Sequence, residues 1–315
     1  MQYRLETAPG IEELCQDLQL RIHHAACVAE GQPGARFCNR LPHARLFATL
    51  ACTGASGGTC TIGERQLPLC PGQVVLVPPA QELHLHFAPG LRLMAFHLDC
   101  RFGAGFDLLA DSSLQSLPVA RRRLARWRTC LDADVDPVPA ALTLQGELLL
   151  LLAGARLLDG ARLAILRSAV RRYRPLFLLT EEQAPAAVDV RACAAAMGMG
   201  ASTLSRAFHR DCGMTLRAFL QERTLHSALD LLRGGHDSSR AISRRLGFGS
   251  EQSFSRFVRR QTGLSPGRYR QRMRSHVLEQ PCPEPPRLRQ DHDQAPLSGC
   301  AGVAAWPGSG RPDDG

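Results

Sequence analysis

Two stretches of the chain, fifty positions apart, carry the same pattern of residues. Residues 197–215 read MGMGASTLSRAFHRDCGMT, and residues 247–265 read GFGSEQSFSRFVRRQTGLS. Aligned at that offset, Ser205-Arg206 falls on Ser255-Arg256, and a glycine near the end of each copy also coincides. A duplicated segment with apolar residues at helical spacing between glycines restricts this part of the chain to short helices joined by tight turns.

The first copy predicts two helices. Residues 189–197 form a short, Ala-rich helix with Asp189 at its N-cap, where a carboxylate can accept from the free N–H groups of the first turn. A Gly-Met-Gly break follows, and the second helix is expected over residues 201–211, with Leu204 and Phe208 on one face. This arrangement predicts a helix-turn-helix, whose second helix enters the major groove of DNA.

The second copy repeats the pattern. A short helix is expected over residues 239–246, and Ser250 caps a second helix that runs to about residue 261, with Phe254 and Phe257 facing inward. Between the copies, residues 216–232 predict one amphipathic connecting helix. A rigid connector would hold the two second helices on a common side, about one duplex turn apart.

Charge supports a nucleic-acid partner. The chain has 38 basic and 29 acidic residues, which gives a net charge of +9, and every basic residue is Arg because the sequence contains no Lys. Between positions 240 and 274 there are ten Arg and one acidic residue, Glu251. Such a surface neutralises phosphates and makes binding depend strongly on salt.

These residues resemble the AraC/XylS family of bacterial transcription regulators. The resemblance covers about residues 185–272 and is carried by ASTLSRAFHRDCGMTLRAFLQERTLHSALDLLRGG and LGFGSEQSFSRFVRRQTGLSPGRYR. It implies two helix-turn-helix units in one chain and a sequence-specific regulator that binds double-stranded DNA. The base-reading positions that it implies are Ser202, Ser205, Arg206, Glu251, Gln252, Ser255 and Arg256, and the expected phosphate contacts are Arg210, Arg259 and Arg260.

The whole chain is predicted to be a multidomain α+β protein. Residues 15–105 have short β-branched and apolar runs separated by turn signals and predict a cupin-like β-barrel that acts as a sensor domain. Residues 112–178 predict central helices that act as a linker or dimerisation region. Residues 180–275 form the all-α domain with two helix-turn-helix units, and the proline-rich residues 276–315 predict a disordered tail.

The segment CPGQVVLVPPAQELHLHF resembles the sensor domain that is common at the front of this family. Glu82, His84 and His86 alternate along one expected strand and would share a face, and His97 follows downstream. These four side chains could line a pocket for a small-molecule effector, hold a metal, or face solvent. The first of these is the prediction that we carry forward, without a metal or other cofactor.

The middle helices are expected either to pair two protomers, with residues 148–152 in the interface of a homodimer, or to pack against the chain's own barrel. A second group of arginines, at positions 121, 122, 123, 126 and 128, is expected on a solvated helix face. If the regulator is an activator, RNA polymerase is a further partner.

Twelve cysteines without a CxxC pair, and a start that lacks an export signal, predict reduced thiols in a cytoplasmic protein. The longest apolar run, residues 148–155, is too short to span a membrane. We expect no enzyme. The alternatives are a metal-dependent cupin enzyme with a nucleic-acid-binding appendage and a nonspecific nucleoid-binding protein.

Overall fold

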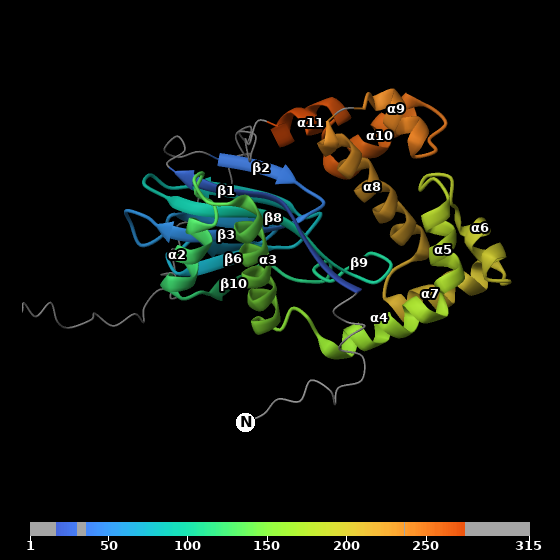
Figure 1. Cartoon of the computed structure of the whole chain (residues 1–315), viewed down its shortest axis with the longest axis horizontal. Coiled ribbons are helices and arrows are strands. Elements are labelled where there is room, and N and C mark those ends of the chain that lie inside the picture. The colour runs from blue at the N-terminus through green and yellow to red at the C-terminus, as the bar shows by residue number, and fades with distance from the viewer. Residues whose placement is uncertain (1–16, 30–35, 236, 275–315) are drawn as a thin grey trace, which may run out of the picture. The chain divides into compact units, whose positions relative to one another are not determined.

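The N-terminal half is built from two antiparallel sheets (Figure 1). The computed structural model describes residues 17–29, 36–235 and 237–274, so the predicted tail lies outside the described residues. The first sheet has the order β1-β8-β3-β6-β10, with β9 paired to β8, and the second has the order β2-β7-β4-β5. The strands are β1 (Leu18–Ala29), β2 (Arg36–Arg40), β3 (Ala44–Ala51), β4 (Gly58–Ile62), β5 (Arg65–Pro68), β6 (Gln73–Val77), β7 (Glu82–Phe87), β8 (Arg92–Phe102), β9 (Phe106–Asp107) and β10 (Gln115–Pro118).

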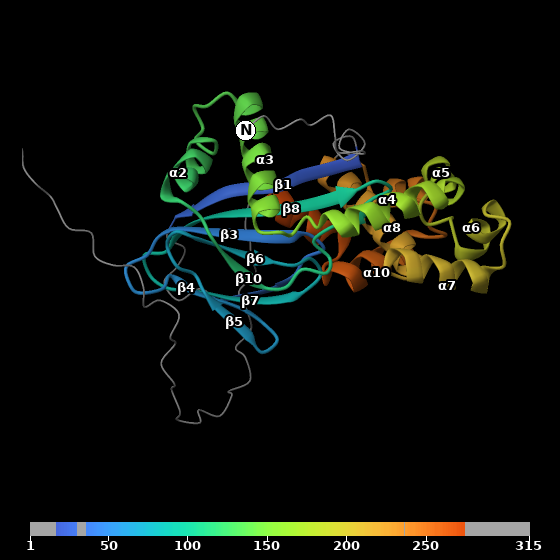
Figure 2. The same ribbon diagram turned by 90° about the horizontal axis from the view of Figure 1, so that it is seen from below.

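The two faces of the first sheet are both buried. Residues such as Phe47 and Leu93 enter an apolar cluster that they share with Leu83 and Leu85 of the second sheet. Their neighbours on the opposite face pack against helices α2 (Arg121–Thr129) and α3 (Pro137–Gly154), which lie beside β1 and β8 in Figure 2. The Trp127 ring of α2 meets a Phe ring of β8 edge to face, with the centroids 5.7 Å apart.

The β-rich N-terminal region is as predicted, but the described strands do not close into one barrel. They form two separately hydrogen-bonded sheets. The strand β10 lies within the stretch 112–178 that was expected to be helical, because residues 115–118 pair with β6. A four-residue strand of this kind has no periodic sequence signal of its own.

Helix α3 faces the first sheet with the residues that were expected in a dimer interface. Leu148 and Leu152 are fully buried and Leu151 is nearly so, whereas Leu150 is 65% exposed. Three of the five positions from 148 to 152 therefore pack on the chain's own sheet, which was the alternative expectation. By length and composition alone, α3 is long and apolar enough to cross a membrane, and one such helix is weak evidence for a membrane span.

The remaining described chain is helical. Helices α4 (Gly160–Arg172) and α5 (Arg174–Glu182) lead into two short-long pairs, α6 (Val190–Ala196) with α7 (Ala201–Cys212) and α9 (Ser239–Arg245) with α10 (Glu251–Thr262). Helix α8 (Leu216–Gly234) connects the pairs, and α11 (Pro266–Arg274) follows the second. The helices predicted from the repeated segment are therefore present.

Candidate nucleic-acid interface

The first helix pair is positioned by its turn and its cap. The Asp189 side chain accepts from the backbone N–H of Ala192 at 2.8 Å, as the sequence predicts. Gly198 adopts a positive φ of 62°, a conformation that glycine reaches without strain, and turns the chain from α6 into α7. In α7, Leu204 and Phe208 are fully buried. The opposite face of the helix is therefore left to solvent.

The second pair has the same arrangement with a stronger cap. The Ser250 hydroxyl accepts from the backbone N–H of Ser253 at 3.1 Å, and the Ser253 hydroxyl accepts from the N–H of Ser250 at 3.2 Å. This reciprocal capping box satisfies two N–H groups that an α-helix start leaves free. In α10, Phe254 and Phe257 are buried, as predicted.

The exposed face is almost the same in α7 and α10. In both helices the fourth, seventh and eighth positions are buried, and the fifth is half-buried. The predicted base-reading residues Ser202, Arg206, Glu251, Gln252 and Arg256 are exposed, and Ser205 and Ser255 are half-buried. The Ser205 hydroxyl donates to the Ala201 carbonyl at 2.8 Å, which leaves its lone pairs available as acceptors.

The three predicted phosphate contacts are exposed, but their surroundings differ. Arg210 donates from Nε to a carboxylate oxygen of Asp211 at 2.9 Å, and this carboxylate also pairs with Arg172. Arg259 and Arg260 have no carboxylate partner within the described residues, although the Arg260 guanidinium lies 5.9 Å from the Phe257 ring centroid. The second pair therefore offers more uncompensated positive charge than the first.

The connector α8 packs on two different cores. Its N-terminal half contributes Leu216 and Phe219 to the core that contains α7, and its C-terminal half contributes Leu229 and Leu232 to the core that contains α10. A helix of this length spans about 28 Å, at 1.5 Å per residue. A second link is the hydrogen bond from the Ala186 N–H to the carbonyl that ends α9, at 2.8 Å. The two pairs are therefore held by more than one connection.

The four residues predicted to bind an effector do not come together. Glu82 and His84 are exposed on β7 and His86 is half-buried on the same face, so the predicted alternation is present. His97 is buried on β8, in the other sheet. Across from His84, the Cys38 sulfur lies 3.6 Å from a Glu82 oxygen and 3.9 Å from His84 Nε2, a group that could hold a metal.

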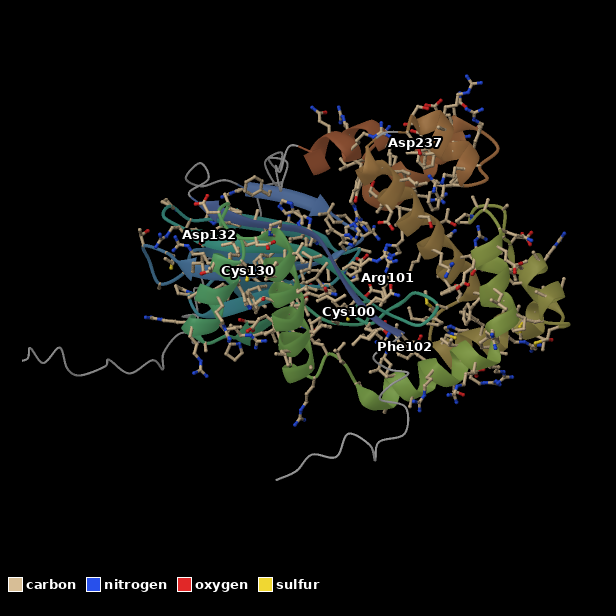
Figure 3. The ribbon with its side chains drawn as sticks, in the orientation of Figure 1. Cys100, Arg101, Phe102, Cys130, Asp132 and Asp237 are labelled. Atoms are coloured by element: carbon tan, nitrogen blue, oxygen red, sulfur yellow. The ribbon has the colours of Figure 1, made fainter. Side chains whose placement is uncertain are left out.

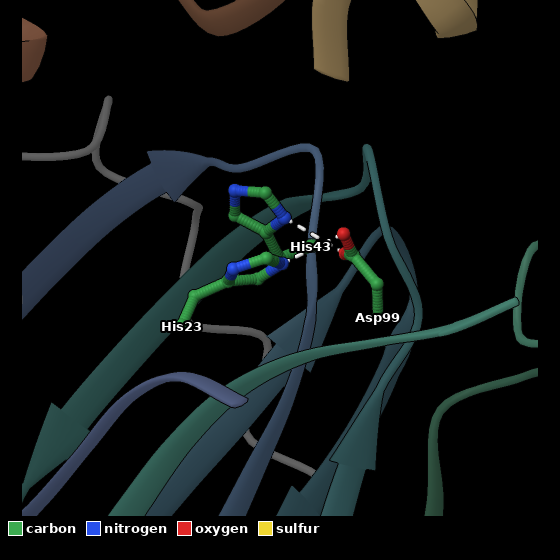
Figure 4. Close-up of side chains that lie close together, drawn as sticks. All are labelled: His23, His43 and Asp99. Carbon is green, nitrogen blue, oxygen red and sulfur yellow. Dashed lines mark hydrogen bonds and ion pairs between the residues drawn. The ribbon is translucent and has the colours of Figure 1, made fainter. Parts of the chain in front are cut away.

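A buried polar cluster forms around Asp99 of β8. Asp99 is fully buried and accepts from His23 Nε2 at 2.7 Å and from His43 Nδ1 at 2.8 Å (Figure 4). It also accepts from Arg101 at 2.5 Å. Burial would raise the pKa of Asp99, but His43 and the hydrogen bonds from the two imidazoles hold it well below its usual range. The carboxylate is therefore ionised.

Helices α8 and α11 complete this cluster. Arg233 of α8 donates to His43 Nε2 at 2.9 Å and also to His23 Nδ1. Arg101 donates to Nδ1 of His226, also on α8. The Tyr269 hydroxyl of α11 lies 3.3 Å from His43 Nε2. Burial lowers the pKa of His43 to about 4 and that of His226 to about 3, so both imidazoles are neutral near pH 7.

The same hydrogen bonds oppose a metal at this cluster, although His23, His43 and Asp99 have ligand atoms close enough to share one. A metal on His23 Nε2 or His43 Nδ1 would place the ring proton on the other nitrogen. In both rings that nitrogen accepts from Arg233, so the proton would face another donor. The arrangement favours a hydrogen-bonded junction between the strands and α8, without a metal.

The helical region matches a known protein family. Residues 193–272 match the family model described as "Helix-turn-helix domain", a match that runs from α6 into α11. No curated protein matches the sequence.

Among solved structures, ToxT from Vibrio cholerae is similar to the chain at 9% identity over 81% of this chain and 98% of that one, with a TM-score of 0.48. The DNA-binding domain of AdpA, solved with a target DNA, has 26% identity over 34% of this chain and 96% of its own, with a TM-score of 0.31. The C-terminal domain of the response regulator yesN from Fusobacterium nucleatum has 18% identity over 30% and 93%, with a TM-score of 0.29.

The matched region runs from the middle of α6 through α7, the connector and the second helix pair, and it includes most of the arginine-rich span from position 240. Residues 193–272 are an AraC-type helix-turn-helix domain, and the resemblance of this chain to the AraC/XylS family of transcription regulators is confirmed.

Proposed function

We propose that the protein is a sequence-specific regulator that binds operator DNA through two helix-turn-helix units, α6–α7 and α9–α10. A DNA-binding transcription regulator follows from the family match. The observation that supports two units is the shared pattern of burial: α7 and α10 have the same burial class at ten of their twelve positions.

The side chains on these exposed faces suit base edges and phosphates. Arg206 and Arg256 can donate two parallel hydrogen bonds to guanine, Gln252 can pair with adenine, and Glu251 can accept from a cytosine amino group. Ser202, Ser205 and Ser255 complete the base-reading set. Arg210, Arg259 and Arg260 contact phosphates and so fix the register of the helices on the duplex.

The test is a mobility-shift titration of the regulator's own upstream DNA. We expect Arg206→Ala with Arg256→Ala to weaken binding by about a hundredfold or more, since each bidentate pair contributes roughly 1–3 kcal/mol. The matched control is Arg65→Ala with Arg122→Ala, which removes the same charge from exposed positions on β5 and α2. Undiminished binding by the first variant would reject the two recognition helices.

Random-site selection separates this proposal from a nonspecific nucleoid protein. A specific regulator returns a consensus with two half-sites, and a nonspecific binder returns none. Metal analysis addresses the alternative of a cupin-type enzyme. Stoichiometric metal lost on His84→Ala or Cys38→Ala would favour that alternative, because Cys38, Glu82 and His84 already approach one another.

We further propose that the strand region senses a small molecule, that the protein acts as a cytoplasmic homodimer, and that RNA polymerase is a partner if it activates. A stripe on α3 supports the dimer: Val138, Leu142 and Leu150 are each 65% exposed and lie four and eight residues apart. Sedimentation of the Leu142→Glu variant tests it. A wild-type protein that is monomeric at micromolar concentration would contradict it.

A further inference from the structure

A cavity of about 740 Å³ lies where β1 and β3 end and β8 begins, against helix α2. Its apolar lining includes Val28, Leu50, Leu93 and Leu124, of which the last two are buried. Ligand pockets in proteins are typically 300–1,000 Å³ with mostly apolar walls and a few placed polar groups. The volume and the lining therefore suit a small organic molecule.

Three arginines, Arg92, Arg121 and Arg128, also line this cavity, and Asp132 is the one acidic residue that the described lining contains. Figure 3 labels Asp132 beyond the end of α2. Within the described chain, none of the three guanidinium groups forms an ion pair. Three positive groups and one carboxylate leave a net charge of about +2 at the cavity.

The arginines of α2 differ in their surroundings, and two of them have a carboxylate partner. Arg123 donates to a Glu147 carboxylate oxygen at 2.5 Å, and Arg126 pairs with the other oxygen at 3.0 Å. Glu147 belongs to α3, so both guanidinium groups share one carboxylate at the junction of α2 and α3. Arg121 and Arg128, on the same helix, have no such partner and line the cavity instead.

We propose that this cavity binds an organic anion with an apolar body. Its anionic group lies among Arg92, Arg121 and Arg128, which can form charge-assisted hydrogen bonds, and its apolar body packs on Leu93 and Leu124. This inference rests on the proposed sensor role and gives that role a site and a ligand class. Glu147 of α3 pairs with two arginines of α2. An anion that shifts α2 would therefore also shift α3, the helix with the exposed apolar stripe.

The experiment compares two fluorescent probes with the same rings. Full-length protein is titrated with 1-anilinonaphthalene-8-sulfonate, which is anionic, and with N-phenyl-1-naphthylamine, which is neutral. We expect saturable one-to-one binding of the anion, about tenfold tighter than that of the neutral probe. Arg121→Gln with Arg128→Gln should weaken the anion about tenfold or more and leave the neutral probe within about twofold.

The matched control is Arg65→Gln with Arg122→Gln, which removes the same charge and should leave the affinity for the anion unchanged. A third variant, Ala125→Trp, fills the cavity from an exposed position on α2 without a charge change and should weaken both probes. Thermal melting confirms that each variant is folded. Equal affinity of the anion for wild type and Arg121→Gln with Arg128→Gln, or equal affinity for the two probes, overturns the proposal.

Failure of the cavity proposal can be distinguished from failure of the proposed DNA-binding function. Operator binding that persists while the anionic probe fails to bind rejects the cavity and keeps the DNA-binding regulator. Anion binding that responds to the arginine variants, in a protein without operator binding, keeps the cavity and rejects the regulator.

Discussion

The two helix pairs present the same exposed pattern but rest on different supports. In the first pair, the Phe208 ring lies 5.2 Å from the Tyr173 ring, 5.5 Å from the Phe219 ring and 6.3 Å from the Phe106 ring of β9. Its core is therefore continuous with the core under the first sheet. In the second pair, Phe254 belongs to a separate apolar cluster with the C-terminal half of α8.

The elements around the second pair meet the strands through polar groups instead. Arg233 and His226 of α8 and Tyr269 of α11 reach the buried carboxylate and imidazoles of the first sheet. An apolar attachment does not titrate, whereas a buried junction that needs neutral imidazoles does. Two copies of one surface pattern are therefore attached to the same chain by two kinds of interaction, which differ in their sensitivity to pH.

The largest expected effect comes from truncating the apolar attachment. Phe208→Ala should lower the free energy of unfolding by about 3–5 kcal/mol, because it removes a fully buried ring. In a Trp306→Phe background, Trp127 reports on the shared core to which Phe208 belongs. Phe254→Ala is the matched comparison and should leave the Trp127 unfolding transition in place. Equal shifts of the Trp127 transition in Phe208→Ala and Phe254→Ala would contradict the assignment of the two helix pairs to separate apolar clusters.

Acid should weaken the polar attachment first. The pKa of a histidine in an unfolded chain is about 6.5. In the folded chain, burial lowers the pKa of His43 to about 4 and that of His226 to about 3. Below pH 6.5 these two histidines therefore bind protons in the unfolded chain that they do not bind in the folded chain, so their contribution to stability is full above pH 6.5 and is lost as the pH decreases toward 4.

For His43 this loss is on the order of 3 kcal/mol, at about 1.4 kcal/mol for each pKa unit. The measurement is the urea midpoint from pH 7.5 to 4.5, with hydrogen exchange to locate the change. We expect exchange to rise first in α8 and α11 and to rise little in α7. His226→Gln should flatten the pH dependence. The same pH dependence of the midpoint in wild type and in His226→Gln would refute the neutral His226 imidazole.

The phosphate contacts should differ in salt dependence. Arg260→Ala should reduce the slope of log binding constant against log salt by about 0.9, the value for one lost phosphate contact. Arg210→Ala, at the equivalent position of the first pair, should reduce it by less, because the guanidinium is already paired with Asp211. Operator titrations at several salt concentrations compare the two variants. A larger change for Arg210→Ala would reverse the assignment.

The smallest effects are expected at the caps of α7 and α10. Ser250→Ala should lower the free energy of unfolding by about 1 kcal/mol, since it removes the capping box. Gly200→Ser should raise it by a few tenths of a kcal/mol. Gly200 has φ −70° and ψ 141°, which serine adopts readily, and an added Cβ would meet its nearest neighbour at 3.8 Å. Urea unfolding of the two variants measures both changes.

The helix pairs could be predicted from sequence because their signals are local. Caps, glycine turns and the spacing of Leu204 and Phe208 all lie within one or two helical turns, so neighbouring residues determine them. The sensor residues could not be placed in the same way. Alternation showed that Glu82 and His84 of β7, in the second sheet, share a face. It does not say which polar residues of the first sheet lie inside, because that sheet is buried on both faces.

The bounds of the two repeated helices and the side chains that they expose follow from local sequence, because short-range hydrogen bonds and helical periodicity fix both. The tertiary structure alone decided that His43 meets Arg233, 190 positions away, and that Arg123 finds Glu147 while Arg128 lines a cavity. Such contacts depend on how distant strands and helices pack, and no local pattern records that packing.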